Sequence, residues 1–146
     1  MVVDWNKFDR GVFLVNVLGI IFKDGKILIG KRSPNPYIEK LTWGFPGGRL
    51  HYGKTVEQSL QEEVKVKTNL KINIKKLIFA RIAPEKEEFL NMYYFCSPIG
   101  SIEKSKAGEK FTELKWVKPT EIEKYFTTSI DPFILKFLSK LEKKSI

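Results

Sequence analysis

Hydrophobic residues near the start of the chain form two short runs that are separated by a turn. Residues 12–22 and 26–32 are mostly apolar and rich in β-branched side chains, and Lys23, Asp24 and Gly25 lie between them. An Asp-Gly pair is typical of tight hairpins because its backbone readily adopts positive φ. The pattern therefore predicts two antiparallel strands joined by a hairpin.

A helical pattern follows a loop rich in glycine and proline over residues 33–48. Apolar residues recur at every fourth position over residues 56–64, which places them on one face of a helix. Thr55 lies just before them, and Gln58 follows three residues later at the spacing of a capping box. We expect a helix that begins after Thr55 and ends near residues 68–69.

The second half of the chain has strand-like alternation and then becomes helical. Thr120 and Glu123 have the spacing of a capping box, and Asp131 before Pro132 is typical of a helix start. Two C-terminal helices are therefore expected. They follow three strands that period-two alternation predicts over residues 71–83, 89–97 and 111–117.

The order of these elements indicates the α+β class, with a layered, sandwich-like plan. The 146 residues contain no internal repeat, and 42% of them are hydrophobic, which is ordinary for a globular chain. A chain of this length buries enough surface to fold without disulfides or a structural metal. We expect one domain over residues 1–146.

The charge balance favours small anionic partners. Lysine and arginine total 26 against 17 acidic residues, so the formal net charge is +9. Such a field attracts nucleotides, polyphosphates or nucleic acid. Lysines spread over many positions are more typical of a solvated surface than of an RNA groove, so nucleic acid is the less favoured partner.

The single cysteine and the hydropathy profile restrict other classes of function. Cys96 lies in the apolar run 92–96, which predicts a buried thiol that packs as a small hydrophobe and forms no internal disulfide. No apolar stretch approaches the ~20 residues that cross a bilayer, and no signal-peptide pattern opens the chain. We expect a cytoplasmic location and no membrane partner.

Gly47 and Gly48 precede the predicted helix, and exposed backbone N–H groups in such a loop can cradle phosphate oxygens. A simple tight loop is the alternative interpretation. In this region the chain resembles the Nudix hydrolase family, whose box reads G-x5-E-x7-R-E-U-x-E-E-x-G-U, with U apolar. The resemblance implies a Nudix-type α/β/α sandwich with a mixed sheet, a loop-helix-loop box and C-terminal helices. Four positions match the box: Gly48, Glu63, Val64 and Leu70.

The other box positions alter what the resemblance implies for metal binding. In the family, carboxylates on one helix face hold Mg²⁺, which bridges the substrate diphosphate. Glu63 keeps one of these carboxylates, whereas the later pair is Val66 and Lys67 and an earlier glutamate is Lys54. Glu62 adds a carboxylate at the arginine position, although adjacent helical residues point about 100° apart. The resemblance thus implies at most a weak Mg²⁺ site, with Glu63 and Glu62 as its candidate ligands.

The chain is most similar in pattern to the GDP-mannose mannosyl hydrolase branch, through residues 29–32 and the stretch 43–49. That branch uses arginines at the positions of Arg32 and Arg49 on the diphosphate and leaving group, a role that suits the guanidinium fork. Substrate binding is thereby implied for five residues: Arg32, Gly47, Gly48, Arg49 and Lys67. Catalytic roles are implied for three: Glu63, Arg49 and Glu109.

The general base is left open by the sequence. The branch carries glutamine and histidine in a loop that corresponds to residues 108–113, and this chain has neither there. Glu109 and Glu113 are acidic alternatives in that loop. His51 is the only histidine, and its position just after the glycine loop is more typical of a partly exposed loop residue than of an acid–base group.

Three classes of function remain open at this point. The first is a Mg²⁺-dependent hydrolase of a nucleoside diphosphate-linked substrate, with nucleotide sugars such as GDP-mannose favoured. The second is a non-catalytic nucleotide or polyphosphate binder that uses lysine and arginine in place of the metal. The third is a nucleic-acid module that stacks bases on Tyr37, Trp43 and Phe45, although no groove-reading motif supports it. Many such relatives pair, so a homodimer through an exposed apolar strand edge is a candidate assembly.

Overall fold

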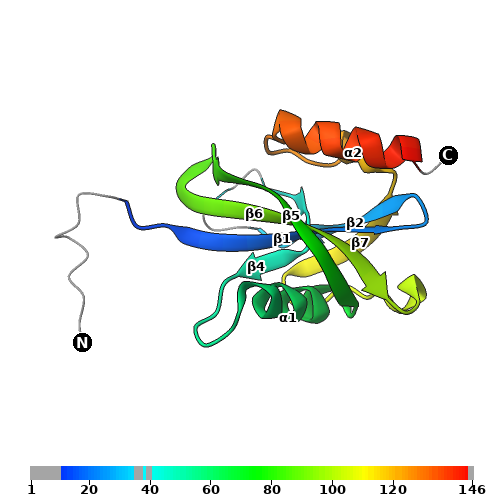
Figure 1. The fold of residues 1–146 in the computed structure, drawn as a ribbon, viewed down its shortest axis with the longest axis horizontal. Helices are drawn as coiled ribbons and strands as arrows, with labels where there is room; N and C mark the ends of the chain where they lie inside the picture. The colour runs from blue at the N-terminus through cyan, green and yellow to red at the C-terminus, as the bar shows by residue number, and fades with distance from the viewer. Residues whose placement is uncertain (1–10, 35–37, 39–40, 145–146) are drawn as a thin grey trace.

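The computed structural model describes residues 11–34, 38 and 41–144. A mixed β-sheet lies between two α-helices, with α1 on one face and α2 on the other (Figure 1). The strands are β1 (Leu14–Lys23), β2 (Lys26–Arg32), β3 (Trp43–Gly44), β4 (Gly47–Arg49), β5 (Lys71–Ala83), β6 (Lys86–Ile99) and β7 (Phe111–Val117). The helices are α1 (Val56–Thr68), α2 (Pro132–Lys144) and the short 3₁₀ helices η2 (Ile102–Lys104) and η3 (Pro119–Lys124).

Strand β1 organises the sheet because it pairs with three neighbours. It runs parallel to β6 and antiparallel to β2 and β4. The predicted hairpin to β2 is confirmed, with Asp24 at φ 51° and Gly25 at φ 78° in the turn. The first half of β1 pairs with β4, so the glycine loop becomes part of the sheet instead of a free loop. This pairing fixes one wall of the site described below.

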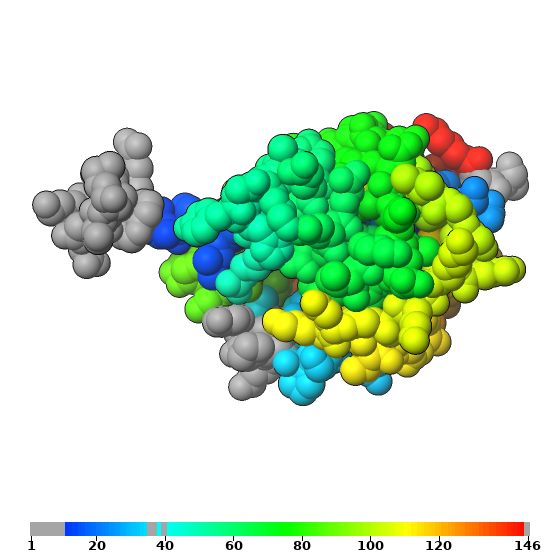
Figure 2. Space-filling view, turned by 90° about the horizontal axis from the view of Figure 1, so that it is seen from below, coloured from blue at the N-terminus to red at the C-terminus, as the bar shows by residue number. Residues whose placement is uncertain are grey.

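Alternate residues of β1 serve two separate hydrophobic cores. Ile20 packs with the side chains of η3 and α2 on one face of the sheet. Val17 and Ile21 pack with Leu60 and Val64 of α1 on the other face. Because both faces are covered, the strand is apolar at nearly every position, as the sequence showed. Figure 2 shows α1 from its own side, covering that face of the sheet.

The predicted boundaries of α1 are confirmed by its caps. The Thr55 hydroxyl accepts a hydrogen bond from the Gln58 N–H at 3.0 Å, and the Gln58 side chain accepts one from the Thr55 N–H at 2.9 Å. At the other end Asn69 adopts the left-handed conformation, with φ 64° and ψ 15°. Asparagine tolerates this geometry, so the helix ends there without a glycine.

The C-terminal segment differs in part from the expectation. The start of α2 is confirmed, because the Asp131 carboxylate accepts a hydrogen bond from the Phe133 N–H at 2.8 Å. The expected capping box of Thr120 and Glu123 was wrong. Glu121 instead accepts a bond from the Lys118 N–H at 3.2 Å, while the Thr120 hydroxyl donates to the carboxylate of Glu142 on α2. The preceding helix is a single 3₁₀ element, η3, instead of a second α-helix.

Two smaller expectations concern the sixth strand and the thiol within it. Strand β6 begins at Lys86 and reaches Ile99, so it is longer than the predicted span 89–97. Cys96 is fully buried, as predicted, and burial raises the pKa of its thiol to about 12. None of the helices in the described part of the chain is long and apolar enough to cross a membrane.

Candidate functional site

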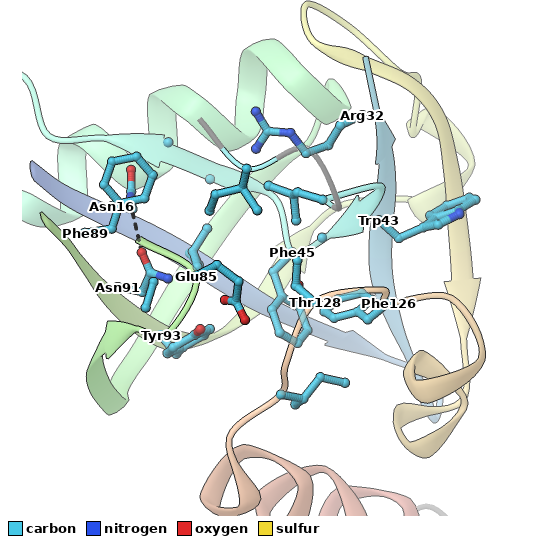
Figure 3. A pocket seen from close by; sticks show the side chains of 18 of the residues that line it. Asn16, Arg32, Trp43, Phe45, Glu85, Phe89, Asn91, Tyr93, Phe126 and Thr128 are labelled. Carbon is cyan, nitrogen blue, oxygen red and sulfur yellow. Dashed lines mark hydrogen bonds between the residues drawn. The ribbon is translucent and has the colours of Figure 1, made fainter. Parts of the chain in front are cut away.

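A cavity of about 360 Å³ opens at the end of the sheet where β4, β1, β6 and β5 lie side by side (Figure 3). Helix α1 and the start of β7 form one side, and the loop between η3 and α2 forms the other. One half of this cavity is rich in charged residues and glycine. The other half, the amide half, is lined by amides and aromatic rings together with Arg81, Glu85 and Asp131. The charged half contains most of the residues that the sequence singled out.

Two glycines let the backbone of β4 approach its neighbours closely. A Cβ atom at Gly47 would lie 2.0 Å from the carbonyl oxygen of Val17, and one at Gly48 would lie 2.6 Å from the Glu63 carboxylate carbon. Real Cβ atoms do not make such contacts, so a side chain at either position requires something to move. The absence of side chains therefore lets Glu63 lie directly against the glycine strand.

Glu63 projects from α1 toward this strand, and only 14% of its side chain is exposed. Its Oε1 lies 3.1 Å from His51 Nε2, and its Oε2 lies 3.8 Å from Lys67 Nζ. Both carboxylate oxygens thus have a nitrogen partner within the protein. His51 itself is 44% exposed and is not part of the cavity lining.

Lys67 lies one helical turn after Glu63 and is the most buried lysine of the cavity, with 9% of its side chain exposed. Its ammonium donates a hydrogen bond to the carbonyl oxygen of Gly47. Burial lowers the pKa of Lys67, and the nearby charge of Glu63 opposes that shift. The positive charge of Arg32 acts in the same direction as burial. The sequence placed a cation here, and the structure shows that it faces the cavity.

The loop before β7 brings Glu109 to the same place. A Cβ atom at Gly108 would lie 2.3 Å from the Val66 carbonyl oxygen, and the Gly108 N–H donates to the Lys67 carbonyl at 2.9 Å. This close contact holds the loop against the end of α1. Glu109 follows with φ 48°, and its negative charge raises the pKa of Lys67. Its carboxylate is exposed to solvent and forms no hydrogen bond or ion pair with the residues that the structure describes.

Arg32 and Arg49 complete the cationic half. Burial lowers the pKa of Arg32, and its Nε atom is buried without a hydrogen-bond partner in the described residues. The Arg49 guanidinium lies 5.2 Å from the centre of the Phe89 ring, in the position of a cation–π contact. Arg32 is the last residue of β2 and Arg49 is the last residue of the glycine strand β4, and both line the cavity.

The structure thus brings together most of the predicted site residues and separates one. Seven line a single cavity: Arg32, Gly47, Gly48, Arg49, Glu63, Lys67 and Glu109. Glu62 lies outside it, because the helix turns it away from Glu63 toward solvent. Its carboxylate pairs with the Lys54 ammonium there, and this hydrogen bond lowers the pKa of Glu62.

The donor set of the cavity does not fit a divalent cation well. Mg²⁺ prefers several oxygen ligands in near-octahedral geometry. In the part of the chain that the structure describes, no three His, Cys, Asp or Glu side chains are grouped closely enough to hold an ion. The ammonium of Lys67 lies 3.8 Å from the Glu63 carboxylate inside the cavity, where it repels a metal ion and already pairs with that carboxylate.

The amide half of the cavity was not found by sequence reasoning. Asn16 and Asn91 line it from neighbouring strands, and the Asn16 amide donates to the Asn91 carbonyl oxygen at 3.0 Å (Figure 3). Each is a single polar residue within an otherwise apolar stretch of strand, which is the signal that identifies them in retrospect. Arg81 also lines this half, and its Nη2 donates to the Ser129 carbonyl oxygen at 2.9 Å.

The aromatic residues that are candidates for base stacking mainly pack the loop. Trp43 makes an edge contact with Tyr125 at 5.3 Å between ring centres, and Phe45 makes one with Phe126 at 5.1 Å. Phe45 is only 8% exposed. The third residue, Tyr37, lies outside the described residues.

Comparison with known proteins places these observations in a family context. The model of the NUDIX domain matches residues 12–137. An ADP-ribose pyrophosphatase of Methanocaldococcus jannaschii is 33% identical over 105 residues, which are 70% of this chain and 60% of that protein. The nucleoside triphosphatase NudI of Escherichia coli is 23% identical over 124 residues, 75% of this chain and 84% of its own.

The fold is shared with solved structures as well. The crystal structure of a NUDIX hydrolase from Nitrosomonas europaea superposes with a TM-score of 0.74 at 20% identity, covering 90% of this chain and 73% of the other. At that identity the likeness concerns the fold alone. The chain spans less than two thirds of the length of its archaeal relative.

Proposed function

Because this chain belongs to the NUDIX domain family, we propose that it hydrolyses a nucleoside diphosphate-linked substrate, with nucleotide sugars such as GDP-mannose favoured. The observation that carries the proposal is that Arg32, Arg49 and Lys67 line one cavity together with the glycines of β4. Three cations beside closely packed backbone suit a diphosphate, which carries charge on several oxygens. The pyrophosphatase and triphosphatase names of two relatives support the same class of substrate.

In this proposal each residue of the cationic half has a separate task. Arg32 and Lys67 neutralise the phosphate oxygens, and Arg49 stabilises the charge that develops on the leaving group. Glu109 accepts a proton from the attacking water, because its carboxylate is exposed and not engaged elsewhere in the described structure. Glu63 holds Lys67 in place through their ion pair.

The reaction is a hydrolysis in which water adds to one side of the broken bond. Attack at the bridging phosphates releases a nucleoside monophosphate and a sugar phosphate. Attack at the sugar carbon, or at the phosphorus that carries the sugar, releases a nucleoside diphosphate and the free sugar. In each case the proton that water loses goes to the base, and the leaving oxygen takes up a proton from solvent.

A second candidate function rests on the Lys67–Glu63 pair. The family generally uses divalent metals, yet here an ammonium occupies the space beside the one carboxylate that faces the glycine strand. We propose as the alternative a metal-independent binder of nucleotides or polyphosphates. Its affinity would fall as the salt concentration rises, because binding would come from attraction between charges.

One experiment separates the two candidates. Purified protein is titrated with GDP-mannose and with ADP-ribose by calorimetry, in Mg²⁺ and in a chelator, and product release is assayed in the same samples. Product release supports the hydrolase, and the product identities report which bond was cleaved. Binding in chelator without any product supports the binder. Absence of binding by either compound and by pyrophosphate contradicts both.

A matched variant connects either result to the cavity. Lys67→Met removes the buried ammonium, whereas Lys65→Met removes an exposed ammonium from the same helix. We expect the first to weaken ligand binding and the second to leave it nearly unchanged. Equal effects would mean that general positive charge, and not the cavity, attracts the ligand.

We also propose a homodimer through the edge strand β5. Within the described part of the chain, strand β5 pairs with β6 alone, and its Leu77 and Ile82 are 47% and 43% exposed. Replacing both with lysine is expected to convert a dimer to a monomer in light scattering. A wild-type protein that is monomeric at high concentration contradicts this assembly.

A further inference from the structure

Four polar side chains form a straight row across the floor of the cavity. Arg49 of β4 pairs in register with Asn16 of β1, Asn16 pairs with Asn91 of β6, and Asn91 pairs with Arg81 of β5. All four line the same cavity. Side chains at paired positions of neighbouring strands lie on the same face of a sheet. The row therefore crosses four strands with two neutral amides between two guanidinium groups.

The row lies where the hydrophobic core ends. Two residues further along β1 and β6, on the same face, Leu18 and Tyr93 pack in the core below α2. Polar side chains within a core-facing strand cost free energy unless they are hydrogen-bonded. The hydrogen bond of 3.0 Å between the two amides offsets only part of this free energy. Their presence on this face therefore needs another explanation.

Most of the hydrogen-bonding capacity of the amides faces the cavity. An asparagine side chain offers two donors and an oxygen with two lone pairs. The Asn16–Asn91 bond uses one donor and one lone pair, and neither amide has another hydrogen bond with the described residues. Neither contributes an atom that is both fully buried and unpaired. Adjacent donors and acceptors thus remain accessible, whichever way each amide is turned.

The distance between the two amides and Arg49 indicates which part of a ligand the amides contact. Neighbouring strands lie about 4.8 Å apart, so Asn16 is about one strand spacing from Arg49, and Asn91 is about two. A group bonded directly to a phosphate held by Arg49 would reach both amides. In a nucleoside diphosphate-linked compound that group is a sugar, whose hydroxyls each donate and accept hydrogen bonds.

The surrounding rings argue against a nucleobase at this position. A base is usually held by an aromatic face open for stacking. Phe89 is 6% exposed and lies under the Arg49 guanidinium, and Tyr93 is 7% exposed with its ring against the edge of Phe45. Phe89 and Tyr93, which lie two residues before and after Asn91 on β6, are therefore largely covered, whereas the amides themselves are accessible.

We propose that Asn16 and Asn91 form a subsite that binds the hydroxyls of the sugar attached to the phosphate, and that this subsite determines which sugar the cavity accepts. The proposal rests on the proposed function only in taking the cationic half as the phosphate site. The sugar is either the pentose of a nucleotide or a terminal hexose. The shared chemistry is a ring with neighbouring hydroxyls next to a phosphate.

The test compares ligands that share a phosphate and differ in hydroxyls. Ribose 5-phosphate, mannose 1-phosphate and methyl phosphate are titrated into the wild-type protein by calorimetry in chelator. We expect at least one sugar phosphate to bind about tenfold more tightly than methyl phosphate, which has no sugar hydroxyl. Preference for the pentose or for the hexose identifies the source of the sugar. Equal affinity for all three compounds overturns the proposal.

Variants then assign the preference to the amides. Asn16→Leu and Asn91→Leu keep the side-chain size, and Asn73→Leu at an exposed position of β5 is the control. The first two variants are expected to lose the preference for the sugar phosphate while pyrophosphate affinity changes less than about twofold. A preference that survives both variants, or a parallel loss of pyrophosphate binding, overturns the role of the amides.

The test of the sugar subsite can be distinguished from the test of the proposed hydrolysis. The hydroxyl preference is a difference in binding and needs no turnover, so a protein without hydrolysis still answers the question. Failure of pyrophosphate to bind contradicts the phosphate site alone. The comparison between sugar phosphates and methyl phosphate uses the wild-type chain, so it stands even if a leucine variant folds poorly.

Discussion

The ammonium of Lys67 lies 3.8 Å from the carboxylate of Glu63 and donates a hydrogen bond to the Gly47 carbonyl oxygen. These contacts join α1 to the glycine strand through a cation that is part of the chain. The pair has the i, i+4 spacing that favours helical ion pairs. It also lies inside the cavity, where screening by solvent is weaker than on the surface.

Replacing Lys67 with glutamate is expected to create a metal-binding site at the position of the lysine ammonium. Lys67→Glu brings a second carboxylate next to Glu63, and two carboxylates suit a divalent cation better than one beside an ammonium. We expect Mn²⁺ binding to become measurable by calorimetry and pyrophosphate affinity in chelator to fall about ten- to hundredfold. Lys65→Glu, on the exposed side of α1, serves as the control. Unchanged pyrophosphate affinity in Lys67→Glu would mean that Lys67 does not contact the ligand.

Adding a carboxylate at Val66 is expected to contribute less. Val66 is 46% exposed and does not line the cavity. The double variant Val66→Glu, Lys67→Glu is therefore expected to bind Mn²⁺ little more tightly than Lys67→Glu alone. A large further gain would show that the end of α1 turns toward the cavity when metal is present.

Anion binding is expected to weaken at alkaline pH. Burial lowers the pKa of Lys67 in the folded protein, so the ammonium loses its proton at a lower pH than an exposed lysine. Below that folded-state pKa the site is positive and attracts phosphate; above it the site is neutral. Pyrophosphate affinity should fall as pH rises toward the usual lysine range. Lys67→Arg keeps its charge there and should show a flatter profile.

The same shift has a consequence for folding. The unfolded chain holds the Lys67 proton more tightly than the folded chain does, so this group contributes a stability that increases with pH between the two pKa values. Urea unfolding at increasing alkaline pH should show a smaller rise for Lys67→Met than for the wild type. An identical pH dependence would mean that the lysine is accessible to solvent in the folded state.

Gly47 is expected to tolerate no side chain. An added Cβ would lie 2.0 Å from the Val17 carbonyl oxygen, which belongs to the backbone of β1. Gly47→Ala must therefore push two strands apart, and such overpacking costs about 1–3 kcal/mol of stability. Gly44→Ala is the control, because a Cβ there meets no atom closer than 4.0 Å. Urea midpoints measure both, and equal midpoints would contradict the close contact between β4 and β1.

Arg81 is expected to hold the loop that closes the amide half of the cavity. Its guanidinium donates to the Ser129 carbonyl at 2.9 Å and lies 3.9 Å from the Asp131 carboxylate at the start of α2. Arg81→Met should increase hydrogen exchange in the segment 127–131 and lower stability by about 1–3 kcal/mol. Lys76→Met, at an exposed position of β5, should do neither. Unchanged exchange in that segment would mean that other contacts fix the loop.

The sequence by itself determined the five longer strands β1, β2, β5, β6 and β7, the helices α1 and α2, and half of the site. The Asp-Gly turn, the Thr55–Gln58 capping box and the alternating apolar runs act through neighbours in the chain, so their effects could be read from local spacing. The glycine pair and the box spacing also placed Gly48, Glu63 and Lys67 on adjacent elements. Thr120 misled because its hydroxyl found a partner on α2, 22 residues away, instead of a local N–H.

Only the tertiary structure decided which polar groups meet. Parallel pairing of β1 with β6 brings Asn16 to Asn91 across 75 positions of sequence, and no local pattern predicts that register. Packing of the Gly108 loop against the end of α1 brings Glu109 toward Lys67, whereas the helical turn carries Glu62 away to Lys54. Hydrogen bonds and ion pairs act over a few ångströms, so the long-range pairing of strands determines the chemistry of this cavity.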